Sequence, residues 1–241
     1  MRSKINNKNI LSYKKWTEIK KLKKKDIIKF YKKFINNYNL LNKKYFFNME
    51  FSKKYVLDQI SNFDQKKENT LRYLPIGIKD NINTKYLSTN YGLKIKKNFK
   101  VGNNANIVSK ILNKNGIIFS KTICAEFAVH HIDSKLNINP HNKNHIAGTS
   151  STGSAIAVAC GALPVALGTQ TAGSIIRPAS FCGVYGFKPT FGAIDRTGIL
   201  KNNDLFDTVG FISNEIQFIE LIFKSTINIS KDHPWTKNYL L

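Results

Sequence analysis

The chain has 241 residues, of which 42% are hydrophobic, and a formal net charge of +23. This length can bury a substantial core in one large domain or two small ones, and the ordinary apolar fraction excludes wholesale disorder. The basic excess is uneven. Residues 1–100 carry 26 Lys and Arg against 7 Asp and Glu, whereas residues 101–241 carry 12 against 8.

The lysine-rich first hundred residues raise the question of nucleic-acid binding, because clustered lysines form a phosphate-binding surface. Arginine, which reads base edges in a bidentate way, occurs only four times in the chain. The lysine runs are mixed with Asn and other uncharged residues, as in residues 36–44, which is typical of ordinary solvated positions. We therefore do not expect nucleic acid as a partner.

The cysteines and apolar runs bear on the compartment. Cys124, Cys160 and Cys182 have no CxxC spacing and cannot all pair, which favours reduced thiols. No apolar stretch follows the charges of the first sixteen residues, so no secretory signal is expected. The longest apolar run, residues 155–167, contains Gly161 and Pro164 and is too short to span a bilayer. These features predict a cytoplasmic protein with no membrane partner.

Helical and strand-like patterns alternate along the chain. Helical spacing occurs in residues 13–45, 55–63, 105–113 and 215–223, and an Ala-rich helix is expected from about residue 154 to Gly161. Compact apolar strands are expected at 74–79, 116–120 and 164–168. Gly/Ser turns at 148–154 and 171–174 interrupt this series. The alternation predicts an α/β architecture with parallel strand pairing.

One window, residues 146–187, differs from the rest of this lysine-rich chain. Its only charged side chain is Arg177, and it holds seven of the chain's 14 glycines. Such exclusion of charge indicates burial or a tightly constrained site. Glycines at turns allow positive φ and close backbone approach, as loops that bind an anion or oxyanion require.

Several familiar sites can be tested against this window. Residues 148–153 have the GxxxxG spacing of a phosphate loop, but Ser154 stands where that loop needs a lysine. The G-x-S-x-G nucleophile elbow is absent. A Ser-His-Asp triad or a metal site that uses His130, His131, His141 or His145 stays open as an alternative, although nothing in their spacing supports it.

The window and its flanks closely resemble the amidase signature. The resemblance covers about residues 70–225 in several ordered motifs, which are GTSSTGS at 148–154, ALGTQTAGSIIRPAS at 166–180 and FCGVYGFKPT at 181–190, with PIGIKDN at 75–81, KTICAEF at 121–127 and DTVG at 207–210. In that family a lysine, a serine preceded by a cis peptide and a second serine form the catalytic triad. The matching positions are Lys79, Ser150 and Ser174.

The chemistry of these residue types agrees with those roles. A serine hydroxyl needs a base to become a nucleophile, and a lysine is a base only when burial lowers its pKa from about 10.4. Lys79 ends an apolar strand, and Ser150 can accept a proton from Ser174 while donating its own to Lys79.

The resemblance also implies an oxyanion hole made by the backbone N–H groups of Thr171, Ala172, Gly173 and Ser174. It implies a cis Thr149–Ser150 peptide bond, and neither a metal nor a cofactor.

The sequence departs from the family pattern in both turns and in length. Thr149 and Thr152 replace glycines of the first turn, while Gln170 and Ala172 replace an Asp and a Gly of the second. The TQTAGS form resembles general amidases more than the transamidation subunit. Family members also run much further beyond the last motif, so we expect the fold to be incomplete on its C-terminal side.

These observations predict one structural domain, with a lysine-rich helical region at 1–70 and an amidase-signature core at 71–241. The expected fold is a mixed sheet covered by helices on both faces. The expected function is hydrolysis of a small amide through a Ser174 acyl-enzyme. The alternatives are a glutaminase-type A subunit of a tRNA-dependent amidotransferase and a truncated, inactive remnant. A second chain, or self-association, would complete the fold.

Overall fold

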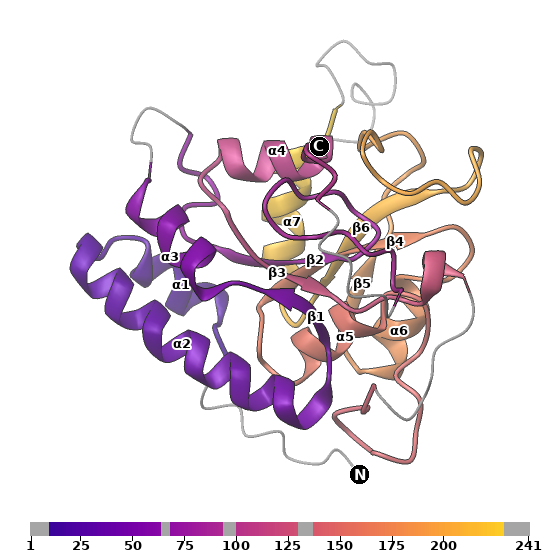
Figure 1. Cartoon of the computed structure of the whole chain (residues 1–241), viewed down its shortest axis with the longest axis horizontal. Coiled ribbons are helices and arrows are strands. Elements are labelled where there is room, and N and C mark those ends of the chain that lie inside the picture. The colour runs from indigo at the N-terminus through magenta and orange to yellow at the C-terminus, as the bar shows by residue number, and fades with distance from the viewer. Residues whose placement is uncertain (1–9, 64–67, 94–99, 130–136, 229–241) are drawn as a thin grey trace.

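The computed structural model describes residues 10–63, 68–93, 100–129 and 137–228 (Figure 1). Its helices are α1 (Tyr13–Ile19), α2 (Lys24–Tyr45), α3 (Lys53–Ser61), α4 (Asn106–Asn113), α5 (Thr152–Ala159), α6 (Ile176–Phe181) and α7 (Ile216–Thr226), with a 3-10 turn η2 at Glu126–Ala128. Its strands are β1 (Asn48–Phe51), β2 (Pro75–Lys79), β3 (Ile117–Thr122), β4 (Val165–Gln170), β5 (Tyr185–Phe187) and β6 (Thr208–Ser213).

The strands form one mixed sheet in the order β1-β3-β2-β4-β6-β5. The central strand β2 runs parallel to both β3 and β4, in a register that places Ile76 opposite Ile118 and Val165. Strands β1 and β6 pair antiparallel with β3 and β4, and β5 pairs antiparallel with β6. The predicted α/β architecture with parallel pairing is therefore confirmed.

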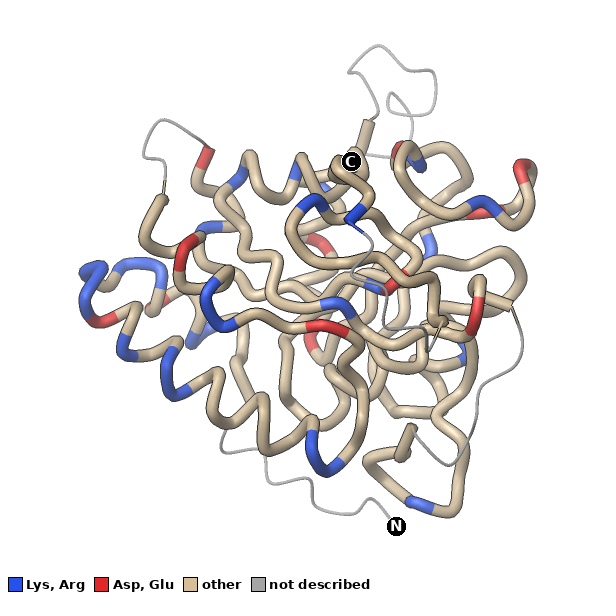
Figure 2. The backbone as a smooth tube through the Cα atoms, viewed as in Figure 1, with Lys and Arg blue, Asp and Glu red and all other residues tan. Residues whose placement is uncertain are grey.

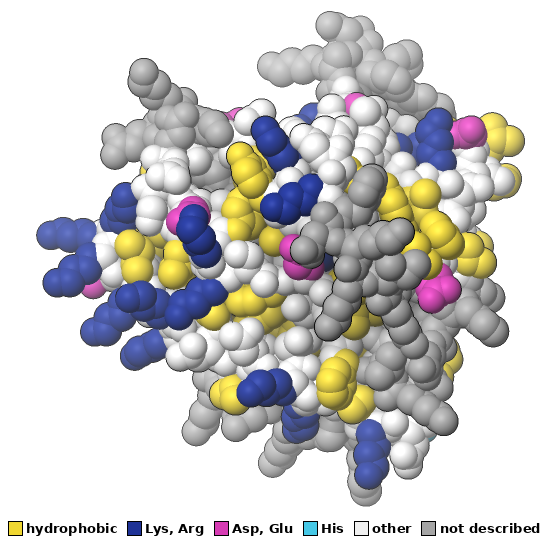
Figure 3. All heavy atoms as spheres, viewed as in Figure 1, with side chains coloured by type: hydrophobic (Ala, Val, Ile, Leu, Met, Phe, Trp, Pro, Cys, Tyr) yellow, Lys and Arg dark blue, Asp and Glu magenta, His cyan; other side chains and the backbone are white. Residues whose placement is uncertain are grey.

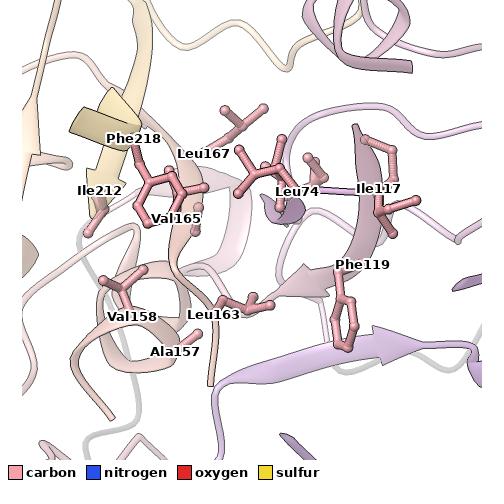
Figure 4. Close-up of a cluster of buried hydrophobic side chains, with 14 of the residues drawn as sticks. Leu74, Ile117, Phe119, Ala157, Val158, Leu163, Val165, Leu167, Ile212 and Phe218 are labelled. Carbon is pink, nitrogen blue, oxygen red and sulfur yellow. The ribbon is translucent and has the colours of Figure 1, made fainter. Parts of the chain in front are cut away.

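Helices cover both faces of this sheet. Helices α4 and α7 pack together on one face, and α5 and α6 pack together on the other (Figure 1). The core fills the space between the layers, and Figure 4 shows a part of it in which side chains of β4 and β6 meet those of α5 and α7. Every residue of α5 is buried, which explains why the predicted Ala-rich helix has no polar face.

Helix α2 carries seven of the chain's lysines and one aspartate. Its buried side chains are Ile27, Tyr31, Phe34, Ile35 and Tyr38, a spacing that forms one apolar stripe. Every lysine of α2 is exposed on the remaining faces, and Figure 2 shows these basic positions along the helix. The exposure of these lysines agrees with their interpretation as solvated positions.

The N-terminal region is joined to the rest of the chain. Strand β1 adds to the sheet beside β3, and the Tyr31 hydroxyl donates to the Tyr73 carbonyl at 2.5 Å. Trp16 Nε1 donates to the Arg72 carbonyl at 3.0 Å. One cluster of buried hydrophobic residues runs from Leu11 to Ile222. These contacts support the proposal of a single structural domain with a boundary between sequence regions near residue 70.

Some short elements carry no sequence signature. Strands β1, β5 and β6 and helix α6 were not predicted, and each has six residues or fewer. Segments this short show no period, and β2, β3 and β4, which are no longer than six residues either, were indicated instead by compact apolar runs. Among the described residues, no helix combines the length and apolar character needed to cross a membrane.

A glycine at the start of α5 sets how closely that helix approaches β3. A Cβ on Gly153 would lie 2.4 Å from the Ile123 nitrogen and 2.5 Å from the Phe47 carbonyl oxygen. Backbone atoms cannot yield, so we predict that Gly153→Ala lowers the free energy of unfolding by about 1–3 kcal/mol despite the better helix propensity of alanine. Urea denaturation measures this change.

The matched control is Gly173→Ala, where the nearest atom to a new Cβ is 3.7 Å away. An equal loss of stability in both variants would contradict the packing argument.

Candidate active site

Lys79 is the last residue of β2 and is fully buried. Its Nζ donates to Ser150 Oγ at 2.8 Å, to Thr169 Oγ1 at 2.7 Å and to the Thr169 carbonyl at 3.3 Å. These three acceptors match the three N–H groups of an ammonium. After loss of one proton, the lone pair can face Ser150 while the other two N–H groups stay on Thr169.

The environment of Lys79 favours the neutral amine. Burial lowers its pKa to about 8, while the Cys124 thiol and the Asp207 carboxylate oppose that shift. No carboxylate oxygen of the described residues lies within 4.0 Å of its Nζ, so no direct ion pair holds the charge. A lysine in this state can act as a base near neutral pH.

Ser150 lies in the turn that precedes α5 and is 1% exposed. The Thr149–Ser150 peptide bond is cis, as the resemblance implied. Gly148 has a φ of +78°, and a Cβ there would lie 2.6 Å from Pro178 Cα, so only glycine fits this approach to α6. The Ala125 N–H donates to the Ser150 carbonyl at 3.1 Å and fixes the backbone of the turn.

Ser174 lies in the second turn, between β4 and α6, and is partly exposed. Gln170 Oε1 accepts from the N–H groups of Ile175 at 2.9 Å and Ile176 at 3.0 Å, which closes the turn. Ser151 N–H donates to the Ser174 carbonyl at 3.3 Å, so the two turns are joined directly.

The N–H groups of the second turn have no acceptor in the described part of the chain. None of Thr171, Ala172, Gly173 and Ser174 donates its N–H to an atom of the described residues. The turn is held instead by Gln170 and by the Thr171 hydroxyl, which donates to Asp207 Oδ1. Asp207 is itself fixed by the N–H groups of Asn202 and Asn203. Four adjacent N–H groups with no acceptor among the described residues, next to a serine, suit the stabilisation of an oxyanion.

The structure thus joins two of the three predicted side chains. The predicted contact between Lys79 and Ser150 is confirmed. No hydrogen bond of the described residues links Ser150 to the Ser174 hydroxyl, so the approach of these two serines stays a prediction.

Sequence reasoning missed Thr169 and Asn81. Thr169 Oγ1 accepts from Asn81 Nδ2 at 2.9 Å as well as from Lys79. The signal was a threonine directly after the apolar run of residues 164–168.

The described residues give no support to a Ser-His-Asp triad or a metal site built from the histidines. His141 Nε2 contacts the Cys182 carbonyl at 2.7 Å, and His145 is exposed next to Asn142. His130 and His131 lie outside the described residues. Within the described ranges, no group of three or more His, Cys, Asp or Glu side chains is arranged to hold a metal ion.

Comparison with known proteins identifies the family. A sequence profile described as Amidase matches residues 29–240. The chain belongs to the amidase family. Over 209 residues it is 34% identical to the A subunit of glutamyl-tRNA(Gln) amidotransferase from Clostridium botulinum (strain Langeland), an alignment that covers 83% of this chain and 43% of that relative. A Halothermothrix orenii protein of the same name is 40% identical over 154 residues, 62% of this chain and 32% of the relative.

Solved amidase-family structures share the fold. The A subunit of glutamyl-tRNA(Gln) amidotransferase from Thermotoga maritima superposes with a TM-score of 0.77 at 26% identity, over 91% of this chain and 48% of that one. The peptide amidase of Stenotrophomonas maltophilia gives a TM-score of 0.79 at 23% identity, over 98% and 51%. The chain therefore spans about half the length of these solved structures, and still less of the curated relatives.

The low pKa of Lys79 makes a prediction about stability. Between pH 8 and 10.5 the folded protein binds fewer protons at Lys79 than the unfolded chain does. The contribution of Lys79 to the free energy of unfolding therefore rises with pH in this window. It is fully present above pH 10.5 and is lost as the pH falls to 8. We predict that the unfolding free energy of wild type minus that of Lys79→Met rises across this window by up to about 3 kcal/mol.

Denaturant titrations of both proteins at a series of pH values measure this difference. Subtraction cancels the contributions of titrating groups that do not interact with Lys79, such as the buried tyrosines Tyr31 and Tyr38. A difference that does not change with pH would contradict the shifted pKa.

Proposed function

We propose that this chain carries the catalytic centre of an amidase that cleaves a carbon–nitrogen bond through an acyl-enzyme on Ser174. The observation that carries the proposal is the fully buried Lys79 amine on the Ser150 hydroxyl. A buried lysine with a lowered pKa and a serine as its acceptor has the components of a base and a proton relay. The turn of Ser174, directly joined to that of Ser150, supplies the nucleophile.

In the proposed first step, Ser174 Oγ attacks the carbonyl carbon of the amide. The Ser174 proton passes to Ser150 Oγ, and Ser150 gives its own proton to the neutral Lys79 amine. The negative charge that forms on the carbonyl oxygen is received by the free N–H groups of residues 171–174, an effect that typically contributes about 10²–10³ in rate. The proton on Lys79 returns through Ser150 to the leaving nitrogen as the carbon–nitrogen bond breaks.

In the second step, a water molecule takes the position next to the acyl carbon that the released amine has left. It gives a proton to Lys79 through Ser150 and attacks the acyl carbon. The carbon–oxygen bond to Ser174 breaks, Ser174 regains a proton, and the carboxylic acid leaves. No redox partner is needed, because only protons and one acyl group move.

A second candidate function is favoured by the names of the relatives. The curated relatives that match here are named as the A subunit of a glutamyl-tRNA(Gln) amidotransferase. The same site would then release ammonia from glutamine for a partner protein. Glutamine hydrolysis that exceeds the hydrolysis of simple amides would favour this function, and the opposite preference would favour a general amidase.

Exposed apolar surface supports a further part of the proposal, that this chain binds a second chain or a second copy of itself. Exposed apolar side chains gather in α6, β5 and the segments that follow, namely Ile176, Phe181, Tyr185, Phe191, Leu205 and Phe206. Strand β5 is also an edge of the described sheet. Figure 3 shows hydrophobic side chains exposed on the side away from the lysines of α2. A second chain, or a second copy of this one, would bury such surface.

A cytoplasmic location also belongs to the proposal. All three cysteines are buried and unpaired. Free thiols of this kind are typical of a reducing compartment.

Labelling with a fluorophosphonate tests the mechanism. We predict that the probe modifies Ser174, because in the proposed mechanism that serine alone has a relay to a buried base. Ser174→Ala and Lys79→Met should both abolish labelling, and Ser180→Ala, at an exposed serine of α6, should keep it. Mass spectrometry of the modified peptide locates the site.

The labelling rate should also rise roughly tenfold between pH 7 and pH 9, because the neutral fraction of Lys79 grows from about a tenth to about nine-tenths around its pKa of about 8. Modification of another residue, or a rate that does not depend on Lys79, would contradict the proposal.

The apolar surface predicts association. We expect wild type to sediment as dimers or larger species, and Leu205→Ser/Phe206→Ser to shift the distribution toward monomer, because these side chains are 73% and 60% exposed. Leu40→Ser, at a 66% exposed position of α2, is the control and should leave the distribution unchanged. A monomeric wild-type protein would contradict this prediction.

A further inference from the structure

A second fully buried lysine lies next to the site. Lys121 of β3 is 0% exposed and stands opposite Ile78 of β2, one residue before Lys79. Its Nζ donates to Thr89 Oγ1 at 2.8 Å and to the Ile82 carbonyl, and lies 3.7 Å from Asp80 Oδ1. All three partners belong to the segment 80–92, which follows Lys79 directly. We call this segment the 80–92 loop.

Asp80 binds the far end of the same loop. Its carboxylate, also 0% exposed, accepts from the N–H groups of Gly92 at 2.9 Å and Asn90 at 3.2 Å. Glu50 of β1 accepts from the Ser88 N–H at 2.6 Å. The loop therefore closes around the buried pair Lys121–Asp80, with both its ends and its interior hydrogen-bonded to charged groups.

One side of the 80–92 loop binds Thr169, which is an acceptor of the Lys79 amine. Asn81 Nδ2 donates to Thr169 Oγ1, which also binds the Lys79 amine. The Asn81 carbonyl accepts from Leu200 N–H at 3.0 Å, and Ile82 forms a bridge with Ile199. A shift of the loop would therefore displace Asn81 and free Thr169 to rotate.

The other side of the loop contacts residues 124–127, and Ala125 of that segment binds Ser150. The Tyr91 carbonyl accepts from Phe127 N–H at 2.8 Å. A Cβ on Gly92 would lie 2.6 Å from the carbonyl oxygens of Cys124 and Ala125, so the backbones are in close contact. Ala125 N–H in turn donates to the Ser150 carbonyl at 3.1 Å.

We propose that Lys121 and Asp80 are a positioning pair, which folds the 80–92 loop against the end of the sheet and thereby holds the Lys79 amine and Ser150 at hydrogen-bond distance. The kinetic part of this inference rests on the proposed function of Lys79 and Ser150. Neither member of the pair contacts the reacting atoms. They act through Asn81 and Thr169 on one side and through Ala125 on the other.

The energetics of burial favour positioning over simple stabilisation. Burial lowers the pKa of Lys121 to about 8, against the opposing effect of Asp80, and burial raises the pKa of Asp80. A buried ion pair costs desolvation that well-packed hydrophobic residues would not, so it is a poor means of gaining stability alone. Its directional hydrogen bonds, however, specify one conformation of the loop.

The test uses the full chain and a fluorophosphonate probe, with the maximal inactivation rate kinact and the half-saturation constant KI measured per folded molecule. Asp80→Asn and Lys121→Met should lower kinact roughly 10- to 100-fold and leave KI within about threefold, because misplacement affects the proton transfer more than binding. Thr89→Val should lower kinact less. Lys110→Met is the control, since its amine binds the carbonyl of Thr226, away from the loop, and it should match wild type.

Hydrogen exchange at the Ala125 amide supplies a readout that needs no activity. It should be faster in Asp80→Asn and Thr89→Val than in wild type. Unchanged kinact in Asp80→Asn and Thr89→Val overturns the proposal. If Lys121→Met does not fold, these two variants alone decide whether the proposal holds. If wild type is not labelled at Ser174, the proposed function fails, and the Ala125 exchange then decides the positioning role: faster exchange supports it and unchanged exchange overturns it.

Discussion

The structure depends on burying a lysine that has no carboxylate in direct contact. Lys79 loses its hydration at the end of β2, and its hydrogen-bond acceptors among the described residues are neutral oxygens of Ser150 and Thr169. Such an arrangement disfavours the charged form and makes the amine a base. It also demands that its acceptors be held rigidly, since an unpaired buried amine would cost free energy. The neighbouring elements meet this demand.

The sheet and the two Gly/Ser turns provide that rigidity. Parallel pairing of β2 with β3 and β4 brings the carboxyl ends of all three strands to one edge, where Lys79, Lys121 and Thr169 lie. The turn of Ser150 begins α5 and the turn of Ser174 ends β4, and one backbone hydrogen bond joins them. The proposed nucleophile, Ser174, is thus left partly exposed, while Lys79 and Ser150, the proposed base and relay, are buried.

The sequence predicted the parts of this arrangement that have a local signature. The apolar strand before Lys79, the uncharged helix α5 and the two turns all carry composition or spacing that a short window reveals. The α/β class and the Lys79–Ser150 contact followed from them and from the family resemblance.

The rest depends on contacts between distant residues. Strand β1, which contributes Glu50 to the 80–92 loop, is too short to predict. Composition could not separate the buried Lys121 from the many exposed lysines of the chain, because only its place in β3 and the loop around it distinguish it. The role of Thr169 likewise requires the register between β2 and β4.

The central claim is that burial lowers the pKa of Lys79 far enough for its amine to act as a base near neutral pH. The titration of Lys79 itself tests this claim most directly. In protein labelled with ¹³C at the lysine ε-carbon, the resonance that Lys79→Met removes belongs to Lys79. The account predicts that this resonance titrates with a pKa of about 8. A titration near the reference value of about 10.4 would contradict it, because Lys79 would then remain protonated and could not accept the serine proton.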